Sequence, residues 1–413
     1  MKDVVVKELV KPERLEGPLK GIKVVDFTHI LAGPYVTGLL ADLGADVVKI
    51  ERVEGDAIRR FAPIKNGESG YFVQLNRGKR NIAMNLRHEK SKDIIKRMIE
   101  KSDIVVENFQ PKAISRLGYG YDVISKWNPR IIMCSVSING QYGPEYAVPG
   151  FDLIAQARGG IMSVTGFPDN PPTKIGPSLG DMNCGSHAAV AILAAIYERE
   201  KSGKGQYIDM AMADCVLRVN EFALPYYDII GKNPPRSGNA HPSAGPCGTF
   251  RTKDNQWIAL ICVSDLTWKR FLDATGHHEW DQDPRFNSIS NRGANRFELQ
   301  EKIDEWFSNI TMEEASAILK KNGCPFSLVF NFSDIATNEQ FLAREMVVTV
   351  DQPKAGKTKI AGNVFKYSRT PCKVQGRTAL LGENNEEVLK EYGYSEAEIK
   401  AFYDEKVIDK PLI

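Results

Sequence analysis

The sequence predicts an α/β protein, with an open, doubly wound parallel sheet in a large domain and a smaller α+β domain. In the first half of the chain, short runs of β-branched residues alternate with segments of helical spacing. A stretch rich in glycine, proline and serine, from 237 to 248, then interrupts this alternation. The length of 413 residues is enough for two or three domains.

Residues 20–51 have the order strand, helix, strand. We expect a strand at 22–28, a turn at 29–34, a helix at 35–43 and a second strand at 46–50. The alternation continues with a helix at 91–101, a strand at 103–107, a helix at 121–127 and a strand at 131–136. Strands joined by single helices are typical of a parallel sheet that carries helices on both faces.

The longest predicted helix covers residues 183–201 and is rich in alanine, isoleucine and leucine. A small α+β domain follows the interruption and ends near residue 330. Its expected elements are strands at 249–250 and 257–263 and helices at 266–275, 298–309 and 312–321. The C-terminal segment 379–402 returns to helical spacing.

The composition argues against several classes of protein. Lysine and arginine number 54 against 52 acidic residues, so the net charge of +2 does not favour a broad nucleic-acid face. We find no apolar run of the roughly 18–20 residues that a membrane span requires, and residues 1–20 lack the apolar core of a signal peptide. The seven cysteines are scattered without a C-x-x-C pair, which indicates free thiols. We therefore expect a cytoplasmic protein that binds neither nucleic acid nor membrane.

The first strand, turn and helix raise the alternative of a dinucleotide-dependent dehydrogenase. Glu51 ends the second strand, where an acidic residue could bind ribose hydroxyls. However, the turn from Thr28 to Gly33 contains one glycine, whereas the G-x-G-x-x-G motif has three. An ordinary α/β crossover explains this unit better than the dehydrogenase alternative does.

Basic residues follow the carboxyl ends of the predicted strands. Arg52 comes directly after the second strand, and Arg116 follows the strand at 103–107 after a loop. The segment between them contains Lys79, Arg80 and Arg87. Each residue alone is better explained as a solvated surface cation, but their recurrence at one edge of the sheet favours a phosphate site.

Asp181 lies after Gly180, where the long helix opens. Aspartate is a preferred N-cap residue, so a structural role is sufficient to explain it. A helix N-terminus also keeps a carboxylate ionised and supplies N–H groups for an oxyanion, so a nucleophile is compatible with a cap. Cys184 has no histidine partner that the sequence identifies. The pair His277-His278 lacks carboxylates at metal-ligand spacing, so we expect no metal.

Seven segments together carry a resemblance that covers about residues 21–391. They are Asp26–Pro34, Gly44–Arg52, Val106–Phe109, Pro149–Asp152, Gly180-Asp181, Gly203–Gln206 and Leu380–Glu383. In this order and spacing, the chain resembles the class III CoA-transferase family. That family includes formyl-CoA transferase, the carnitine CoA-transferases and the 2-methylacyl-CoA racemases.

The resemblance implies a site and a chemistry. The family's nucleophile is the aspartate after glycine where the long helix opens, which is Asp181 here. The positions that contact CoA fall on Leu31, Ala32, Arg52, Met84, Arg87, Asn108, Phe109 and Arg116. CoA and acyl-CoA are then substrates, with no tightly bound cofactor. Asp181 would form an aspartyl anhydride and then an aspartyl-CoA thioester before CoA passes to an acceptor acid.

The resemblance also implies how the domains are built. Residues 19–225 and 338–413 would form the large domain from both chain ends, and 235–330 the small domain. Family members form interlocked homodimers, and some act with a paralogous subunit. We therefore expect a homodimer, with a non-catalytic subunit of a heteromer as an alternative. The loop at 239–248 has fewer consecutive glycines than that of formyl-CoA transferase. This favours succinyl-CoA and a larger acid over formyl-CoA and oxalate.

Residue 151 separates transfer from racemisation. The racemases place a histidine directly before the aspartate of the Pro-Gly-x-Asp segment, as one of two proton-transferring residues. Phe151 cannot exchange a proton, so the sequence favours CoA transfer, with a racemase or epimerase as the alternative. Pro149 and Asn384 are further departures from the family pattern. Because Pro149 lies near a lysine position of formyl-CoA transferase, the substrate of that enzyme is a poor guide here.

Overall fold

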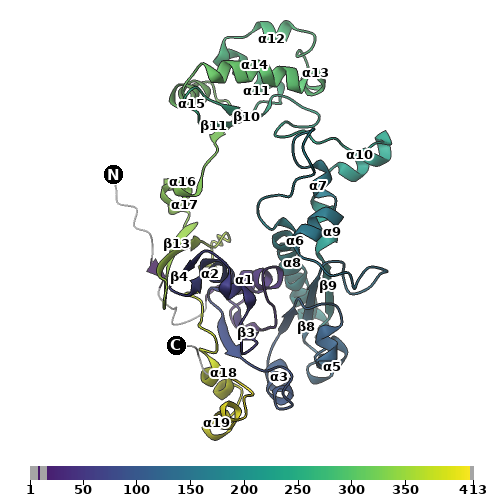
Figure 1. Cartoon of the computed structure of the whole chain (residues 1–413), viewed down its shortest axis with the longest axis vertical. Helices are drawn as coiled ribbons and strands as arrows, with labels where there is room; N and C mark the ends of the chain where they lie inside the picture. Colours follow the sequence, from purple (N-terminus) through teal and green to yellow (C-terminus); the bar gives the residue numbers. More distant parts are fainter. Residues whose placement is uncertain (1–7, 10–15, 410–413) are drawn as a thin grey trace. The chain divides into compact units, whose positions relative to one another are not determined.

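The computed structural model describes residues 8–9 and 16–409, and Figure 1 shows its helices and strands. The chain divides into two compact units. The first comprises the described parts of Met1–Gly159, Gly176–Val219 and Ala336–Ile413, and the second comprises Gly160–Ile175 and Asn220–Ile335. Described residues from the N-terminal and the C-terminal parts of the chain therefore belong to the same unit.

Residues 160–175 lie in the second unit, whereas the sequence analysis places them in the large domain. Hydrogen bonds explain the difference. The N–H of Gly238 donates to the carbonyl of Gly166 at 2.9 Å, and the guanidinium of Arg236 donates to the carbonyl of Phe167 at 3.2 Å. The segment thus folds onto residues 236–238, which lie in the same compact unit although α8, β9 and α9 separate the two segments in the sequence.

A six-stranded sheet forms the centre of the first unit, and all of its strands are parallel. In sheet order the strands are β6 (Arg80–Ala83), β3 (Asp46–Glu51), β2 (Lys23–Asp26), β7 (Ile104–Glu107), β8 (Ile132–Ser137) and β9 (Tyr207–Ala211). The predicted parallel sheet is confirmed. Its order reverses between β2 and β7, so the carboxyl ends of these two strands flank the switch point where such sheets bind ligands.

The edge strands β6 and β9 are not among the strands that the sequence analysis predicts, because polar residues interrupt their apolar runs: Arg80 and Asn81 begin β6, and Asp209 lies in the middle of β9. The edge at β6 is covered by the C-terminal part of the chain. Asn384 accepts the N–H of Asn81 at 2.9 Å, and Asn385 accepts the N–H of Ala83 at 3.0 Å, in each case through the side-chain oxygen. Asn384, a departure from the family pattern, therefore supports the edge of the sheet.

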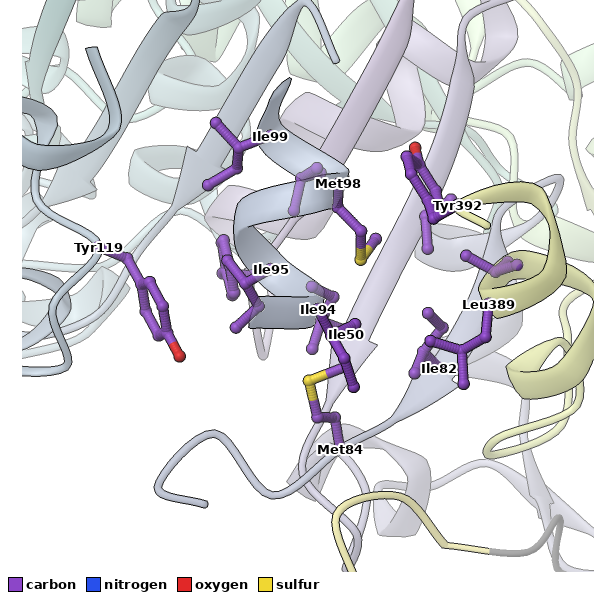
Figure 2. Close-up of a cluster of buried hydrophobic side chains, with 14 of the residues drawn as sticks. Ile50, Ile82, Met84, Ile94, Ile95, Met98, Ile99, Tyr119, Leu389 and Tyr392 are labelled. Atoms are coloured by element: carbon purple, nitrogen blue, oxygen red, sulfur yellow. The ribbon is translucent and has the colours of Figure 1, made fainter. Parts of the chain in front are cut away.

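Helices cover both faces of this sheet. One face carries α1 (Ala32–Asp42) and α8 (Leu179–Ser202), which pack against each other. The other face carries α3 (Ser91–Glu100), α5 (Tyr121–Trp127), α18 (Asn385–Glu391) and α19 (Glu396–Asp404). Figure 2 shows side chains of α3 and α18 gathered over Ile50 and Ile82 of the sheet in the main hydrophobic core.

Smaller elements complete the first unit. They are α2 (Gly70–Asn76), α4 (Ala113–Arg116), α6 (Asp152–Arg158), α9 (Met212–Val219), α17 (Glu339–Ala343) and a 3-10 helix at Ala57–Arg60. Short strands form two further sheets: β1 (Glu8–Leu9) with β13 (Val347–Gln352) and β14 (Gly356–Ala361), and β4 (Ile64–Lys65) with β5 (Glu68–Ser69). The helix α16 (Phe332–Thr337) spans the boundary between the units.

The second unit combines an antiparallel sheet with helices, in agreement with the predicted α+β class. The sheet order is β10 (Cys247–Arg251), β11 (Trp257–Ile261) and β12 (Phe326–Leu328). The helices are α7 (Ile161–Val164), α10 (Ala223–Ile230), α11 (Asp265–Thr275), α12 (Glu279–Gln282), α13 (Ile289–Ala294), α14 (Arg296–Ser308) and α15 (Met312–Lys321). Its separate hydrophobic core includes Phe250, Trp268 and Phe307.

Within the described residues, α8 alone is long and apolar enough to cross a membrane by length and composition. The sequence prediction of no such run is therefore wrong by this measure. However, α8 packs against α1, α9 and β8. Near its end, Arg199 is 2% exposed and pairs with Asp103 at 3.0 Å. These contacts are those of a core helix in a globular unit.

Candidate active site

The turn after β2 lies at the switch point of the sheet. The N–H of His29 donates to the side-chain oxygen of Asn108 at 2.8 Å, and the amide of Asn108 donates to the carbonyl of His29 at 2.8 Å. The ring of His29 also stacks on Phe109, with 5.3 Å between centroids. These contacts join the carboxyl ends of β2 and β7 and bring together two predicted CoA contacts, Asn108 and Phe109.

Ile30 has a left-handed backbone conformation, with a φ of 64°. This conformation is strained for a β-branched residue and requires support from its surroundings. The carboxylate of Asp56 supplies that support by accepting the N–H of Ile30 at 3.2 Å. Lys49 pairs with Asp56 at 3.3 Å and also donates to the carbonyl of Thr28 at 2.6 Å, and both charged side chains are buried. Lys49 and Asp56 therefore fix the conformation of the turn through these buried contacts.

The helix α1 begins at Ala32, three residues before the predicted start. Pro34 fits there because the N–H groups of the first turn have no partner within the helix. Gly33 is required for packing, since a Cβ atom would lie 2.5 Å from Thr28 and 2.9 Å from Asn108. The glycine of this turn thus permits close packing within the chain, which weakens the dinucleotide alternative.

Asp181 lies in the first turn of α8, and its side chain is half-buried. The predicted role of Asp181 as the N-cap is wrong, because the helix begins at Leu179 and Ser178 is the N-cap. The hydroxyl of Ser178 does not cap the helix and instead forms a hydrogen bond with Tyr71. The carboxylate of Asp181 accepts a hydrogen bond from the backbone N–H of Ala32. A hydrogen bond therefore connects Asp181, the predicted nucleophile, with Ala32, one of the predicted CoA contacts.

The helix N-terminus does not hold the pKa of Asp181 at or below its ordinary value, contrary to the expectation from the sequence. Burial raises the pKa of Asp181 from 3.8 to about 7, and the nearby charge of Asp152 adds to the rise. The N–H of Ala32 acts in the opposite direction without cancelling them. A macrodipole is worth at most about 2 kcal/mol, so it does not outweigh lost hydration together with a second carboxylate.

Asp152 is a residue whose importance the sequence analysis misses, although the Pro-Gly-Phe-Asp segment is noted there. It begins α6 and is 8% exposed. One of its carboxylate oxygens accepts the N–H of Gly180 at 2.8 Å, directly before Asp181. Phe151 is the N-cap of α6, so no imidazole stands beside this carboxylate. The only signal in the sequence is an acidic residue at the start of a helix, which is common in ordinary helices.

The other predicted CoA contacts have different surroundings. Leu31 is 4% exposed and packs with Ile58 and Phe72 in a small apolar cluster. Met84 is fully buried in the main core, as Figure 2 shows, and its N–H donates to the carbonyl of Glu51 at 2.8 Å. The side chain of Met84 is thus part of the core packing in this structure.

The three predicted arginines are all exposed. Arg52 follows β3, Arg87 follows β6 and Arg116 ends α4, which follows β7. Arg52 is close enough to His29 that its charge lowers the pKa of that ring, although burial is the larger cause. All three cations therefore lie in segments that leave the carboxyl edge of the sheet. Among the residues that the structure describes, no group of three histidine, cysteine or acidic side chains could hold a metal ion.

The family model described as CoA-transferase family III matches residues 19–385. The chain belongs to CoA-transferase family III. The resemblance seen in the sequence is thus confirmed, and this protein is a CoA-transferase by family.

Known relatives cover nearly the whole of this CoA-transferase. It is 38% identical over 387 residues to the succinyl-CoA:mesaconate CoA-transferase of Haloarcula marismortui, which is 91% of this chain and 97% of that protein. It is 35% identical over 408 residues to the formyl-CoA:oxalate CoA-transferase of Streptomyces coelicolor, with 94% and 99% covered. The crystal structure of a CAIB/BAIF family protein from Brucella suis superposes with a TM-score of 0.81 at 34% identity, covering 91% of this chain and 100% of that one.

The raised pKa of Asp181 predicts that Asp181→Asn stabilises the fold at pH 8. In the unfolded chain this carboxylate ionises near 3.8, whereas in the folded protein it ionises near 7. The wild type therefore loses stability as the pH rises from about 4 to 7, while the neutral asparagine does not. We expect the melting temperature of the variant to exceed that of the wild type by roughly 2–4 °C at pH 8, and the difference to vanish near pH 4.

The control for this measurement is Asp122→Asn, which changes an exposed acidic residue in the first turn of α5. Its melting temperature should follow that of the wild type at both pH values. If Asp181→Asn is less stable than the wild type at pH 8, Asp181 contributes stability as a charged group, and the raised pKa is wrong.

Proposed function

We propose that this enzyme moves CoA from an acyl-CoA donor to a carboxylic acid through covalent intermediates on Asp181. One observation carries the proposal: a half-buried carboxylate in the first turn of α8 meets the N–H that opens α1, beside the switch point of the sheet. Since its pKa is about 7, much of this carboxylate is ionised at neutral pH and is more basic than an ordinary aspartate.

The proposed reaction has four steps. A carboxylate oxygen of Asp181 attacks the thioester carbonyl of the donor and expels CoA thiolate, leaving an aspartyl anhydride. The thiolate attacks the aspartyl carbonyl and expels the donor acid, leaving an aspartyl-CoA thioester. The acceptor carboxylate attacks this thioester and regenerates the thiolate with a new anhydride. The thiolate then attacks the acceptor's acyl carbonyl, which gives the product acyl-CoA and the free Asp181 carboxylate.

The backbone N–H of Ala32 has a defined task in this sequence. In the second and third steps the reacting carbonyl belongs to Asp181 itself, and negative charge develops on its oxygen. An N–H group fixed beside that side chain stabilises this charge without reorganising. The buried pair of Lys49 and Asp56 supports the turn that leads into Ala32, so the donor is preorganised.

Succinyl-CoA is the donor that we propose, with a larger organic acid as the acceptor. The succinyl-CoA:mesaconate relative supports this choice. The formyl-CoA:oxalate relative supports the alternative, in which formyl-CoA is the donor and oxalate is the acceptor. The apolar cluster beside Asp181 also supports a larger acid, because Leu31 and Phe72 pack there with the partly buried Tyr71 and Met182.

Asp181→Ala tests the covalent mechanism. We expect transfer of CoA from succinyl-CoA to any acid in a panel of carboxylates to fall by about three orders of magnitude or more, while CoA binding is retained. Mass spectrometry of the wild type, quenched after mixing with succinyl-CoA, should find added mass on the peptide that contains residue 181. Transfer that continues in Asp181→Ala, or a wild-type peptide that never gains mass, would exclude Asp181 as the nucleophile.

The CoA site that we propose follows the carboxyl edge of the sheet. Arg52, Arg87 and Arg116 would bind the phosphate groups, since an exposed guanidinium matches phosphate oxygens in charge and geometry. Phe109, stacked on His29, would flank the cofactor, and the thioester end would reach Ala32 next to Asp181.

Arg116→Ala tests the phosphate site. Loss of a hydrogen bond between charged groups costs about 1.5–3 kcal/mol, so the dissociation constant of CoA should rise roughly 10- to 100-fold by isothermal calorimetry. Arg130→Ala is the matched control, because Arg130 is also exposed but precedes β8 at the opposite edge of the sheet. Equal affinity for CoA in the two variants would remove Arg116 from the proposed site.

The homodimer expected from the family resemblance has support on α8. Val190 and Tyr197 are 66% and 67% exposed, and their spacing places them on one face of that helix. Burial of this apolar face by a second copy would stabilise the assembly. Native mass spectrometry should give about twice the chain mass of 46.0 kDa. A 46.0 kDa species that gains activity only with a paralogous chain would instead favour a heteromer.

A further inference from the structure

Asp152 has no place in the four proposed steps, yet its carboxylate is fixed next to the nucleophile. One oxygen accepts the N–H of Gly180 at 2.8 Å, and the other accepts the side-chain amide of Gln156 at 2.7 Å. Gly180 makes this approach easier, since a Cβ atom there would crowd that carboxylate at 3.1 Å and Ala155 at 3.2 Å. Asp152 is therefore held by the residue that directly precedes Asp181.

Positive charge does not balance this pair of carboxylates. Among the residues that the structure describes, no lysine or arginine charge contributes to the pKa shift of Asp181, which is caused by burial, by the charge of Asp152 and by the N–H of Ala32. The groups that face Asp181 are Asp152 from α6, the hydroxyl of Tyr71 from α2, the N–H of Ala32 from α1, and Cys184 from its own helix. Two acidic groups thus share a partly buried space with neutral neighbours.

This arrangement acts differently on the free and the acylated enzyme. A free Asp181 carboxylate is repelled by Asp152 and is poorly hydrated, so its charged form is raised in free energy. In an anhydride or a thioester the Asp181 side chain itself carries no charge, because the negative charge has passed to the CoA thiolate or to the released acid, so the repulsion between Asp152 and the Asp181 side chain is absent. The neighbouring carboxylate therefore favours attack by Asp181 and also favours the covalent intermediates that follow.

We propose that Asp152 is a positioning residue of the transfer reaction. Anchored by Gly180 and Gln156, it places a second carboxylate beside Asp181 and destabilises the free nucleophile relative to its acylated forms. This inference rests on the proposed covalent role of Asp181. It assigns to the aspartate of the Pro-Gly-Phe-Asp segment an electrostatic function that is distinct from holding the start of α8.

The test measures how fast succinyl-CoA at a saturating concentration adds mass to residue 181, between pH 5 and pH 9. In the wild type, the rate should rise with pH with a midpoint near 7. In Asp152→Asn, which keeps the shape and the acceptor for Gly180, the midpoint should fall by about one pH unit or more. The rate at pH 8 should fall about 10-fold, because the carboxylate becomes a weaker nucleophile. The KM for succinyl-CoA should not change.

Gln156→Met is the matched variant. It removes the amide that holds Asp152 but keeps both carboxylates, so the midpoint should stay near 7 or rise. A purely structural role for Asp152 predicts the opposite pattern, in which Asp152→Asn lowers the rate at every pH and leaves the midpoint in place. That result would overturn the inference while leaving the nucleophile intact.

The wild type provides a second test that does not depend on the folding of any variant. A midpoint near 4, the ordinary value for aspartate, would overturn the role of Asp152 even though mass is added to residue 181. If no mass is added at any pH, the covalent function of Asp181 fails first, and the inference fails with it.

Discussion

The candidate active site depends on two buried ion pairs beneath the turn between β2 and α1. Lys79 pairs with Asp26 at 3.2 Å, and Lys49 pairs with Asp56 at 3.3 Å, with all four side chains almost fully buried. Buried charges are costly unless their remaining hydrogen-bonding groups are satisfied. Here they are satisfied largely by the turn itself, since Lys79 also donates to the carbonyl of Pro34 at 2.9 Å. Any other path of the backbone would leave a buried charge without a partner.

The surroundings of the proposed nucleophile, Asp181, destabilise its charge, whereas those of the buried ion pairs stabilise theirs. Whereas opposite charges and hydrogen bonds surround the buried ion pairs beneath the turn, Asp181 faces a second carboxylate and accepts only one hydrogen bond that favours its charge. Active sites commonly give up stability in this way for reactivity. The ion pairs and hydrogen bonds of the turn thus hold Ala32 in place beside a carboxylate whose charge has little compensation.

The fold was more predictable than the site. Hydrophobic alternation predicts β2, β3, β7 and β8 because these strands are buried and lie between clear helical segments. It misses β6 and β9, which contain polar residues that hydrogen-bond to distant parts of the chain. For the site, motif order predicts Asp181, Asn108 and Phe109, and the structure places Asn108 and Phe109 at the switch point of the sheet. Spacing could not reveal Asp152, because its effect depends on a distance across two helices, and burial reverses the expected direction of the pKa of Asp181.

The hydrogen bonds that the C-terminal part of the chain forms with the edge strand β6 have a consequence for folding during synthesis. Asn81 and Ala83 find their acceptors on Asn384 and Asn385, about three hundred positions further along the chain. Contacts of such separation form slowly, and a ribosome delivers the chain from its N-terminus. Until residues 384 and 385 have emerged, one border of the central sheet presents open N–H groups to other nascent chains. This border therefore closes long after its own strand has been synthesised.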